Sequence, residues 1–212
     1  MVCVLMLIVV TGGIGSGKTY VTKIFETLNI PILHADQIAK DIILNNKNIY
    51  ETIQKYFNVF NVQQNFKKIK LEIFKYKKKR LFLENIIHQK VLEKISNIST
   101  NCIVEIPLLH NLSNLLTFIK FDKLILVNCD KNIQISRVMR RDKLSKAQVM
   151  LIINSQLSIA NGVNKIQQLA DYIVDGNNLD RLHIQAIHLC SLLKNMLQNI
   201  VQDITIYPHE VN

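Results

Sequence analysis

The chain has 212 residues, of which 49% are hydrophobic and 20% charged, and this composition predicts a globular protein with a sizeable core rather than a disordered chain. The formal net charge is +10, but the lysines occur with many Asn and Ile residues, as in a chain drawn from an AT-biased coding sequence. We therefore favour a solvated lysine-rich surface over the alternative of polyanion binding, and we expect no nucleic-acid partner. The four cysteines are far apart and lack metal-binding spacing, which favours reduced core cysteines over a metal site.

The first element is an apolar run at residues 4–10. It is too short to span a bilayer, and it leads into a glycine-rich loop without a basic leader or a cleavage site. We expect a buried strand here, no membrane span and a cytoplasmic protein.

The loop that follows this strand has the spacing of a phosphate-binding loop. Gly12, four further residues, and then Gly17, Lys18 and Thr19 satisfy the G-x-x-x-x-G-K-[ST] pattern. Glycines allow positive φ values, so that backbone N–H groups can turn inward toward a polyphosphate. A dinucleotide fingerprint does not fit, because its third glycine would fall at Lys18. The residues expected to contact the nucleotide are Gly12, Gly13, Ile14, Gly15, Ser16, Gly17, Lys18, Thr19 and Tyr20.

The chemistry of the loop assigns a role to each polar group. We expect Lys18 to reach the β- and γ-phosphates, the Thr19 hydroxyl to bind Mg²⁺, and the N–H of Tyr20 to lie near the α-phosphate. A guanine-reading Asn-Lys-x-Asp segment is absent, since the nearest string, at residues 46–49, lacks the carboxylate. ATP with Mg²⁺ is therefore the expected ligand pair.

Beyond the loop, apolar residues follow helical and strand patterns in turn. Continuous apolar strands separated by helices predict an α/β fold with a parallel sheet covered by helices on both faces. We expect strands at 4–10, 30–33, 102–106, 122–128 and 171–175, and helices at 19–28, 36–44, 131–156 and 179–201, with a frayed tail from 203. A single domain, 1–212, would then comprise a core at about 1–44 and 101–212, a helical insertion at about 45–100 and a lid at about 131–160.

Carboxylate and guanidinium groups suited to phosphoryl transfer lie outside the loop. Asp36 follows the strand at 30–33, and ligands bind at the carboxyl ends of parallel strands, so Asp36 is a candidate base. An equally weighted alternative is that Asp36 caps the next helix. Arg137, Arg140 and Arg141 could neutralise a migrating phosphoryl group, or form an ordinary basic helix face.

Two further residues are typical of structural roles. His88, taken alone, is typical of a structural or surface histidine, and Asp130 of the N-cap of the helix after its strand.

The motifs together resemble the dephospho-CoA kinase family over nearly the whole chain. The matching segments are Thr11–Thr19, His34-Ala35-Asp36, Ile87-His88, Pro107-Leu108-Leu109, the register from Arg137 through Arg141-Asp142 to Gln156, and Ala170–Asp175. The sequence departs from the family pattern at His34, Gln89, Asn111 and Gly176.

The resemblance implies a P-loop kinase in which ATP phosphorylates the 3′-hydroxyl of the dephospho-CoA ribose, the final step of coenzyme A biosynthesis. It implies Asp36 as base, Lys18, Arg137 and Arg141 as further catalytic groups, and Asp36, His88, Pro107 and Leu108 at the acceptor. The partners would be dephospho-CoA and ATP, with the chain a monomer or a weak homo-oligomer. The alternatives are a kinase of another small metabolite or nucleotide, and a noncatalytic ATP-binding regulator, which the departures at His34 and Asn111 make conceivable.

Overall fold

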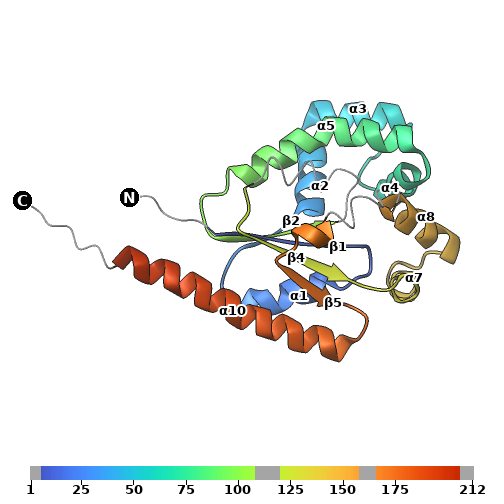
Figure 1. Ribbon diagram of the computed structural model, residues 1–212. Helices are drawn as coiled ribbons and strands as arrows, with labels where there is room; N and C mark the ends of the chain where they lie inside the picture. Colours follow the sequence, from blue (N-terminus) through green and yellow to red (C-terminus); the bar gives the residue numbers. More distant parts are fainter. Residues whose placement is uncertain (1–5, 108–119, 158–165, 206–212) are drawn as a thin grey trace, which may run out of the picture.

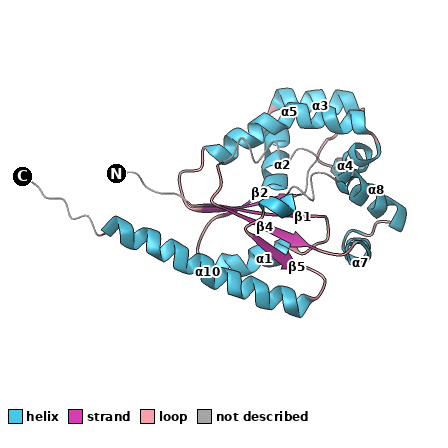
Figure 2. Cartoon of the chain, viewed as in Figure 1, coloured by secondary structure: helices cyan, strands magenta, loops and turns pink. Residues whose placement is uncertain are grey.

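The sheet of the protein is parallel and has β1 at its centre. The computed structural model describes residues 6–107, 120–157 and 166–205, so the expected site residue Leu108 lies outside the described residues, as does Asn111. Within them, five strands, magenta in Figure 2, pair in the order β2-β3-β1-β4-β5. The strands are β1 (Leu7–Gly12), β2 (Ile32–His34), β3 (Cys102–Pro107), β4 (Lys123–Asn128) and β5 (Tyr172–Asp175).

Helices cover both faces of this sheet (Figure 1). They are α1 (Lys18–Phe25), the 3₁₀ helix η1 (Glu26–Leu28), α2 (Ala35–Asn45), α3 (Lys47–Phe57), α4 (Phe66–Lys75), α5 (Lys77–Ser96), α7 (Lys131–Asp142), α8 (Lys146–Leu157) and α10 (Leu179–Thr205). On one face, Phe25 of α1 and Leu182 of α10 pack with Val10 of β1. On the other face, Ile38 of α2 packs with Val9. Both faces of β1 are therefore buried, which explains its continuous apolar sequence.

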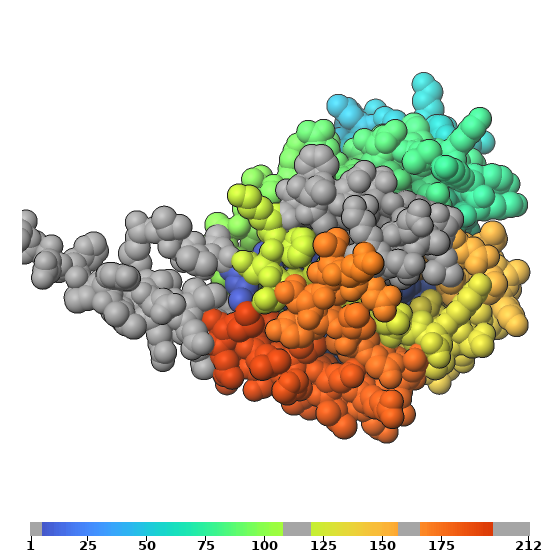
Figure 3. All heavy atoms as spheres, in the orientation of Figure 1, coloured from blue at the N-terminus to red at the C-terminus, as the bar shows by residue number. Residues whose placement is uncertain are grey.

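The helices α3, α4 and α5 form an insertion between α2 and β3. Their apolar side chains, among them Ile53, Phe57 and Leu83, form a cluster separate from the two clusters on the sheet. Helix α4 also packs against α8, so the insertion meets the later part of the chain at one side of the molecule. Figure 3 shows the insertion in cyan and green at the top, with α10 in red along the bottom.

The helices α7 and α8 lie beside the loop that follows β1. Lys143 ends α7 in the left-handed conformation with φ 54°, so the helical stretch predicted at 131–156 is two helices rather than one. Val138 and Ile153 form the core between them, and Ile14 of the loop packs against this core. The loop is thus held on one side by α7 and α8.

Several predicted boundaries are corrected by the structure. The helix predicted to end at 201 continues to Thr205. The prediction of a frayed tail from 203 is therefore wrong for residues 203–205. The N-cap of α2 is His34 rather than Asp36, so the alternative that Asp36 caps this helix is wrong. Asp130 occupies the N-cap position of α7 as predicted, although its side chain makes no capping hydrogen bond. No helix within the described ranges is long and apolar enough to cross a membrane.

Candidate active site

The loop between β1 and α1 requires glycine at two positions. Gly15 has φ +74° and Gly17 has φ +110°, a region that side chains disfavour. Space is also short, because a Cβ on Gly15 would lie 2.8 Å from Cγ2 of Val138, and one on Gly17 would lie 2.8 Å from Cδ2 of Leu182. The loop therefore fits closely between α7 and α10, and its path depends on the absence of side chains.

Lys18 is the first residue of α1 and is 8% exposed. Its Nζ donates hydrogen bonds to the carbonyl oxygens of Gly12, at 3.0 Å, and Gly13, at 2.9 Å. An ammonium group has three N–H donors, so one remains for a ligand. Burial lowers the pKa of Lys18 to about 8, against the opposing effect of the carboxylates of Glu105 and Asp36.

Asp36 lies in the first turn of α2, where its side chain is exposed. The preceding strand β2 pairs with β3, with His34 opposite Glu105, so this turn begins at the same end of the sheet as the glycine loop. The negative charge of Asp36 acts on Lys18. The structure therefore brings the candidate base and the loop lysine together.

Glu105 of β3 connects three elements of the site. Its carboxylate accepts hydrogen bonds from the hydroxyls of Thr19, at 3.2 Å, and Thr22, at 3.4 Å, both on α1. The Nδ1 atom of His34 lies 3.0 Å from its Oε2 atom. The side chain of Glu105 is only 12% exposed, and its charge acts on Lys18 and on Arg141. Glu105 is thus the central acidic group of the site.

Glu105 belongs to no motif that the sequence pattern singled out. A signal was available, because Glu105 is the one charged residue in the strand Cys-Ile-Val-Glu-Ile-Pro, and a carboxylate in a mostly buried strand needs hydrogen-bonding partners. Its partners Thr19 and His34 are 86 and 71 residues away in the chain. Only the pairing of the strands shows which groups they are.

Arg137 of α7 binds the backbone of the glycine loop. Its Nη1 donates to the carbonyl oxygens of Gly176, at 2.7 Å, Gly15, at 3.3 Å, and Ser16, at 3.4 Å. A Cβ on Gly176 would lie 2.2 Å from the Ser16 carbonyl oxygen, so the turn after β5 fits directly against the loop. The guanidinium group of Arg137 therefore joins the loop to this turn.

Arg141 lies one turn further along α7 and is 60% exposed. Its Nε and Nη2 atoms donate to both carboxylate oxygens of Asp142, at 2.7 and 2.9 Å, and these bonds lower the pKa of Asp142. Lys67 and Lys70 of α4 also act on Asp142, and Arg141 and Lys70 act on Lys18. The charges of Lys70 on α4 and Arg141 on α7 therefore both act on the loop lysine.

Four further residues that the sequence predicted for the site are Ile14, Tyr20, Pro107 and His88. The N–H of Ile14 donates to Oε1 of Gln156 on α8, at 3.0 Å, and the hydroxyl of Tyr20 lies 2.9 Å from Nδ1 of His183 on α10. Pro107 ends β3 level with Gly12, at the loop edge of the sheet. His88 is half-buried on α5, where burial lowers its pKa. In the described part of the chain, no hydrogen bond or ion pair joins His88 to the loop.

The site fits ATP and Mg²⁺ by its chemistry. The Oγ atom of Ser16 is buried with no hydrogen-bonding partner in the described structure, so a polar atom in the loop is available to a phosphate. The first turn of α1 also leaves N–H groups without partners inside the helix. Mg²⁺ in such sites is bound by few protein oxygens together with phosphates. The Thr19 hydroxyl next to Glu105 matches that donor set.

The parallel sheet, the loop between β1 and α1 and the charged groups around Lys18 define a P-loop kinase. The family model for dephospho-CoA kinase matches residues 6–181. The chain therefore belongs to the dephospho-CoA kinase family, and it is a phosphotransferase of coenzyme A biosynthesis.

Individual relatives agree with this assignment. A dephospho-CoA kinase from Gamma-proteobacterium EBAC31A08 is 38% identical over 162 residues, which cover 72% of this chain and 81% of the relative. One from Halalkalibacterium halodurans is 33% identical over 197 residues, covering 87% and 94%. The solved structure of the dephospho-CoA kinase from Campylobacter jejuni has a TM-score of 0.57 and 25% identity, and covers 89% of this chain and 97% of that chain.

Proposed function

We propose that the chain transfers the γ-phosphoryl group of ATP to the 3′-hydroxyl of the dephospho-CoA ribose, giving CoA and ADP. The observation that supports this reaction is the glycine loop that ends at the buried Lys18, whose ammonium group binds two loop carbonyls beside the Thr19–Glu105 pair. The charges of Asp36 and Arg141 also act on this ammonium group. Phosphoryl transfer needs a phosphate cradle, a positive clamp and a carboxylate beside the acceptor hydroxyl. These groups come from the glycine loop, α7 and α2.

The glycine loop and Lys18 would hold the β- and γ-phosphates. The N–H donor of Lys18 that is not used by Gly12 and Gly13 can reach a phosphate oxygen without breaking the loop. Thr19 and Glu105 would hold Mg²⁺, directly or through a water, and the ion would neutralise charge on the phosphates. Because Glu105 also binds Thr22 and His34, the Thr19 hydroxyl is held in a fixed direction.

Asp36 would accept or orient the proton of the attacking ribose hydroxyl. It is exposed in the first turn of α2, so an acceptor can approach it, and its charge already acts on the lysine that holds the donor phosphates. A positioned general base contributes about 10²- to 10⁴-fold to rate. His34 differs from this role, because its ring is bound to Glu105.

The two lid arginines would act differently. Arg141 is exposed and lies within electrostatic range of Lys18, so it can neutralise charge that develops on the transferred group. Arg137 has its Nη1 atom bound to three backbone carbonyls, so its contribution is to hold the loop in shape. His88, Pro107 and Leu108 are proposed at the acceptor from the family resemblance.

We also propose that the chain works in the cytoplasm, as a monomer or a weak homo-oligomer. The described cysteines Cys102, Cys129 and Cys190 are all unpaired, as is usual in a reducing compartment.

The direct test is product mass after incubation of the protein with Mg-ATP and a panel of acceptors. We expect phosphate on dephospho-CoA, and not on adenylate or shikimate. Lys18→Ala should abolish transfer and keep the fold, because removing an ammonium group whose burial is costly does not weaken the core. Circular dichroism and thermal melting check the fold. Greater phosphorylation of another acceptor, or large residual turnover in Lys18→Ala, would contradict the proposal.

A further inference from the structure

We propose that one corner of the insertion binds the surface of an anionic membrane. This basic corner comprises the last turn of α3, the turn that follows it and the beginning of α5, and its exposed residues are Tyr56, Phe60, Tyr76, Lys77 and Lys78. The surface lies outside the active site, so its role does not depend on the proposed transfer reaction.

The positive charge of the protein is concentrated in the insertion. Residues 45–100 contain 12 of the 26 Lys and Arg residues but only 4 of the 16 Asp and Glu residues, so they carry +8 of the formal net charge of +10. An AT-biased coding sequence would raise the lysine content along the whole chain, whereas outside this stretch the charges nearly balance. The concentration of charge therefore indicates an anionic partner for the insertion.

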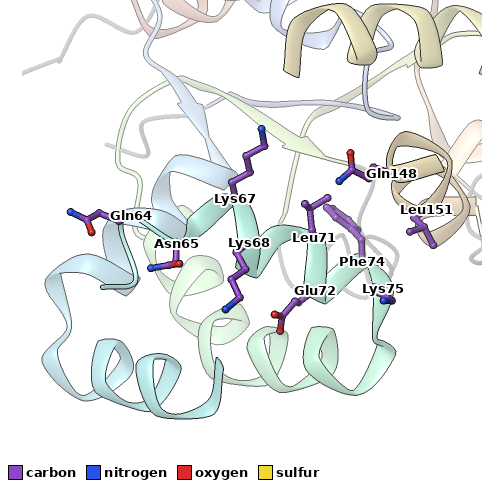
Figure 4. A pocket seen from close by; sticks show the side chains of 10 residues that line it. All are labelled: Gln64, Asn65, Lys67, Lys68, Leu71, Glu72, Phe74, Lys75, Gln148 and Leu151. Atoms are coloured by element: carbon purple, nitrogen blue, oxygen red, sulfur yellow. The ribbon is translucent and has the colours of Figure 1, made fainter. Parts of the chain in front are cut away.

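The active site does not account for all of these lysines. Figure 4 shows Lys67 and Lys68 pointing in opposite directions from α4, so this helix presents positive charge on two sides. Lys67 acts on Asp142, beside the active site. Lys77 and Lys78 are not among the charges that act most strongly on Asp142 or on the loop lysine. The lysines at the beginning of α5 therefore belong to a second basic surface.

Positive charge at the beginning of α5 is unfavourable for the helix itself. Lys77 and Lys78 are exposed in the first turn, which contains no acidic residue, and the N-cap Tyr76 makes no side-chain capping hydrogen bond. The positive end of the helix macrodipole lies at this end, so cations there are repelled. The macrodipole therefore disfavours these lysines, and an anionic surface would offset that cost.

Aromatic contacts join the end of α3 to the beginning of α5. The ring of Tyr56 stacks on that of Phe82, with centroids 3.5 Å apart and an interplanar angle of 9°. The Nζ atom of Lys79 lies 5.7 Å from the ring centroid of Phe57 and 5.4 Å from that of Tyr76. Tyr56 and Tyr76 are nevertheless 41% and 46% exposed. The two helix ends therefore form one surface with exposed tyrosine side chains.

Phe60 gives this surface an apolar point. Its side chain is 94% exposed, more than any other large apolar side chain of the described residues. The position of Phe60 is fixed, because its carbonyl oxygen accepts a hydrogen bond from Nε2 of Gln54 on α3. A phenyl ring in this position gains nothing from the fold, whereas it gains by entering the interface of a bilayer. An exposed ring beside lysines and tyrosines is typical of a membrane-binding surface.

An anionic membrane fits the corner better than a nucleic acid does. A base stacks on a free aromatic face, but Phe82 covers one face of Tyr56, and the ammonium group of Lys79 lies over the ring of Tyr76. The cytoplasmic leaflet of a membrane carries anionic lipids that attract lysines, and its interface accepts an apolar side chain such as Phe60. The corner therefore combines an electrostatic and an apolar attraction, which together give reversible attachment.

The test measures sedimentation of the protein with vesicles of phosphatidylglycerol and phosphatidylcholine in equal parts, and with vesicles of phosphatidylcholine alone. We expect binding to the anionic vesicles only, and release at high salt, because salt screens exposed charges. Lys77→Glu combined with Lys78→Glu should weaken binding by at least about tenfold, which corresponds to about 1.4 kcal/mol. This double variant should not lower Tm, because acidic residues are favourable at a helix N-terminus.

Lys90→Glu combined with Lys94→Glu is the matched control. It changes the net charge by the same amount on the same helix, but about 20 Å or more from the corner, since a helix rises about 1.5 Å per residue. Because this distance exceeds the screening length, vesicle binding should stay within about twofold of wild type. Equal losses in the two double variants would mean that net charge, and not the corner, determines binding, and would overturn the inference.

Fluorescence tests whether Phe60 enters the bilayer. The chain contains no Trp, so Phe60→Trp introduces a single indole. Its emission should shift to shorter wavelength when anionic vesicles are added, because the indole enters a less polar interface. Ile184→Trp is the control, since Ile184 is 68% exposed on α10, and its emission should not shift. An unshifted emission at position 60, or equal shifts at both positions, would contradict the proposed orientation on the membrane and overturn the inference.

Two further outcomes would also overturn the inference. One is that wild-type protein fails to bind anionic vesicles or binds both kinds of vesicle equally. The other is that it binds a labelled single-stranded RNA in fluorescence anisotropy and does not bind vesicles, which would assign the corner to nucleic acid. None of these measurements uses ATP or an acceptor, so their results do not depend on the proposed function.

Discussion

Replacing Asp36 by Asn tests the assignment of the base most directly. Asp36 is exposed in the first turn of α2, whose N-cap is His34. The substitution therefore removes a negative charge near the helix N-terminus but leaves the N-cap residue unchanged. Such a charge contributes about 0.3–1 kcal/mol. In a domain of this size 1 kcal/mol shifts Tm by about 2–4 °C, so we expect Tm to fall by roughly 1–4 °C.

The expected effect of Asp36→Asn on rate is much larger. Loss of a general base should lower kcat by about 10²- to 10⁴-fold, which corresponds to about 2.7–5.5 kcal/mol of barrier. Steady-state kinetics with dephospho-CoA measures this, and calorimetry should show that both substrates still bind. Asp180→Asn is the control, since Asp180 lies in the first turn of α10. It should lower Tm by a similar amount and leave kcat unchanged.

Two results would refute the reasoning about Asp36. A kcat within tenfold of wild type would mean that Asp36 is not the base. A loss of many degrees in Tm would mean that the side chain has structural contacts that its exposure does not suggest. His34→Ala combined with Asp36→Asn should be slower than Asp36→Asn only by the factor that His34→Ala costs alone, because the His34 ring is bound to Glu105 and does not replace Asp36 as base.

Further predictions concern Arg141, Lys18 and Cys102. Arg141→Ala should lower kcat far more than it weakens ATP binding, because an exposed lid arginine acts mainly on charge that develops in the transition state; equal losses in kinetics and calorimetry would point to ground-state binding. Burial lowers the pKa of Lys18 to about 8 in the free protein, and bound phosphate should raise this pKa. Above pH 8, ATP binding should therefore take up a proton, and the affinity for ATP should fall as the pH rises. Calorimetry in buffers of different ionisation enthalpy measures the proton uptake, and proton release would contradict the prediction. Between pH 8 and 10.5 the unfolded chain carries a proton at Lys18 that the folded protein lacks, so this group should make stability rise with pH in that window. Burial raises the pKa of Cys102 to about 11, so peptide mapping should find Cys102 unmodified by a thiol reagent at pH 8 in the native protein and modified after denaturation; rapid native modification would refute its burial.

The parts of the protein that depend on neighbours in sequence could be predicted from the sequence alone. The glycine loop is a local motif that can be recognised from the sequence alone. Its conformation requires residues without a side chain, such as Gly15 and Gly17. The strands and helices follow from the periodicity of apolar residues, because a parallel strand covered on both faces must be apolar throughout. Asp36 could be placed near the loop because carboxyl ends of parallel strands share one edge.

Only the tertiary structure decided which distant groups meet. Glu105 binds Thr19 and His34 because β3 lies between β1 and β2, an order that apolar periodicity does not determine. Arg137 and Arg141 belong to one sequence motif, yet one turn of helix directs the first to the loop backbone and leaves the second exposed. The contact between α4 and α8 likewise exists only because a segment that precedes β3 packs against one that follows β4. Sequence specifies local conformation, whereas contacts between elements depend on the packing of the whole chain.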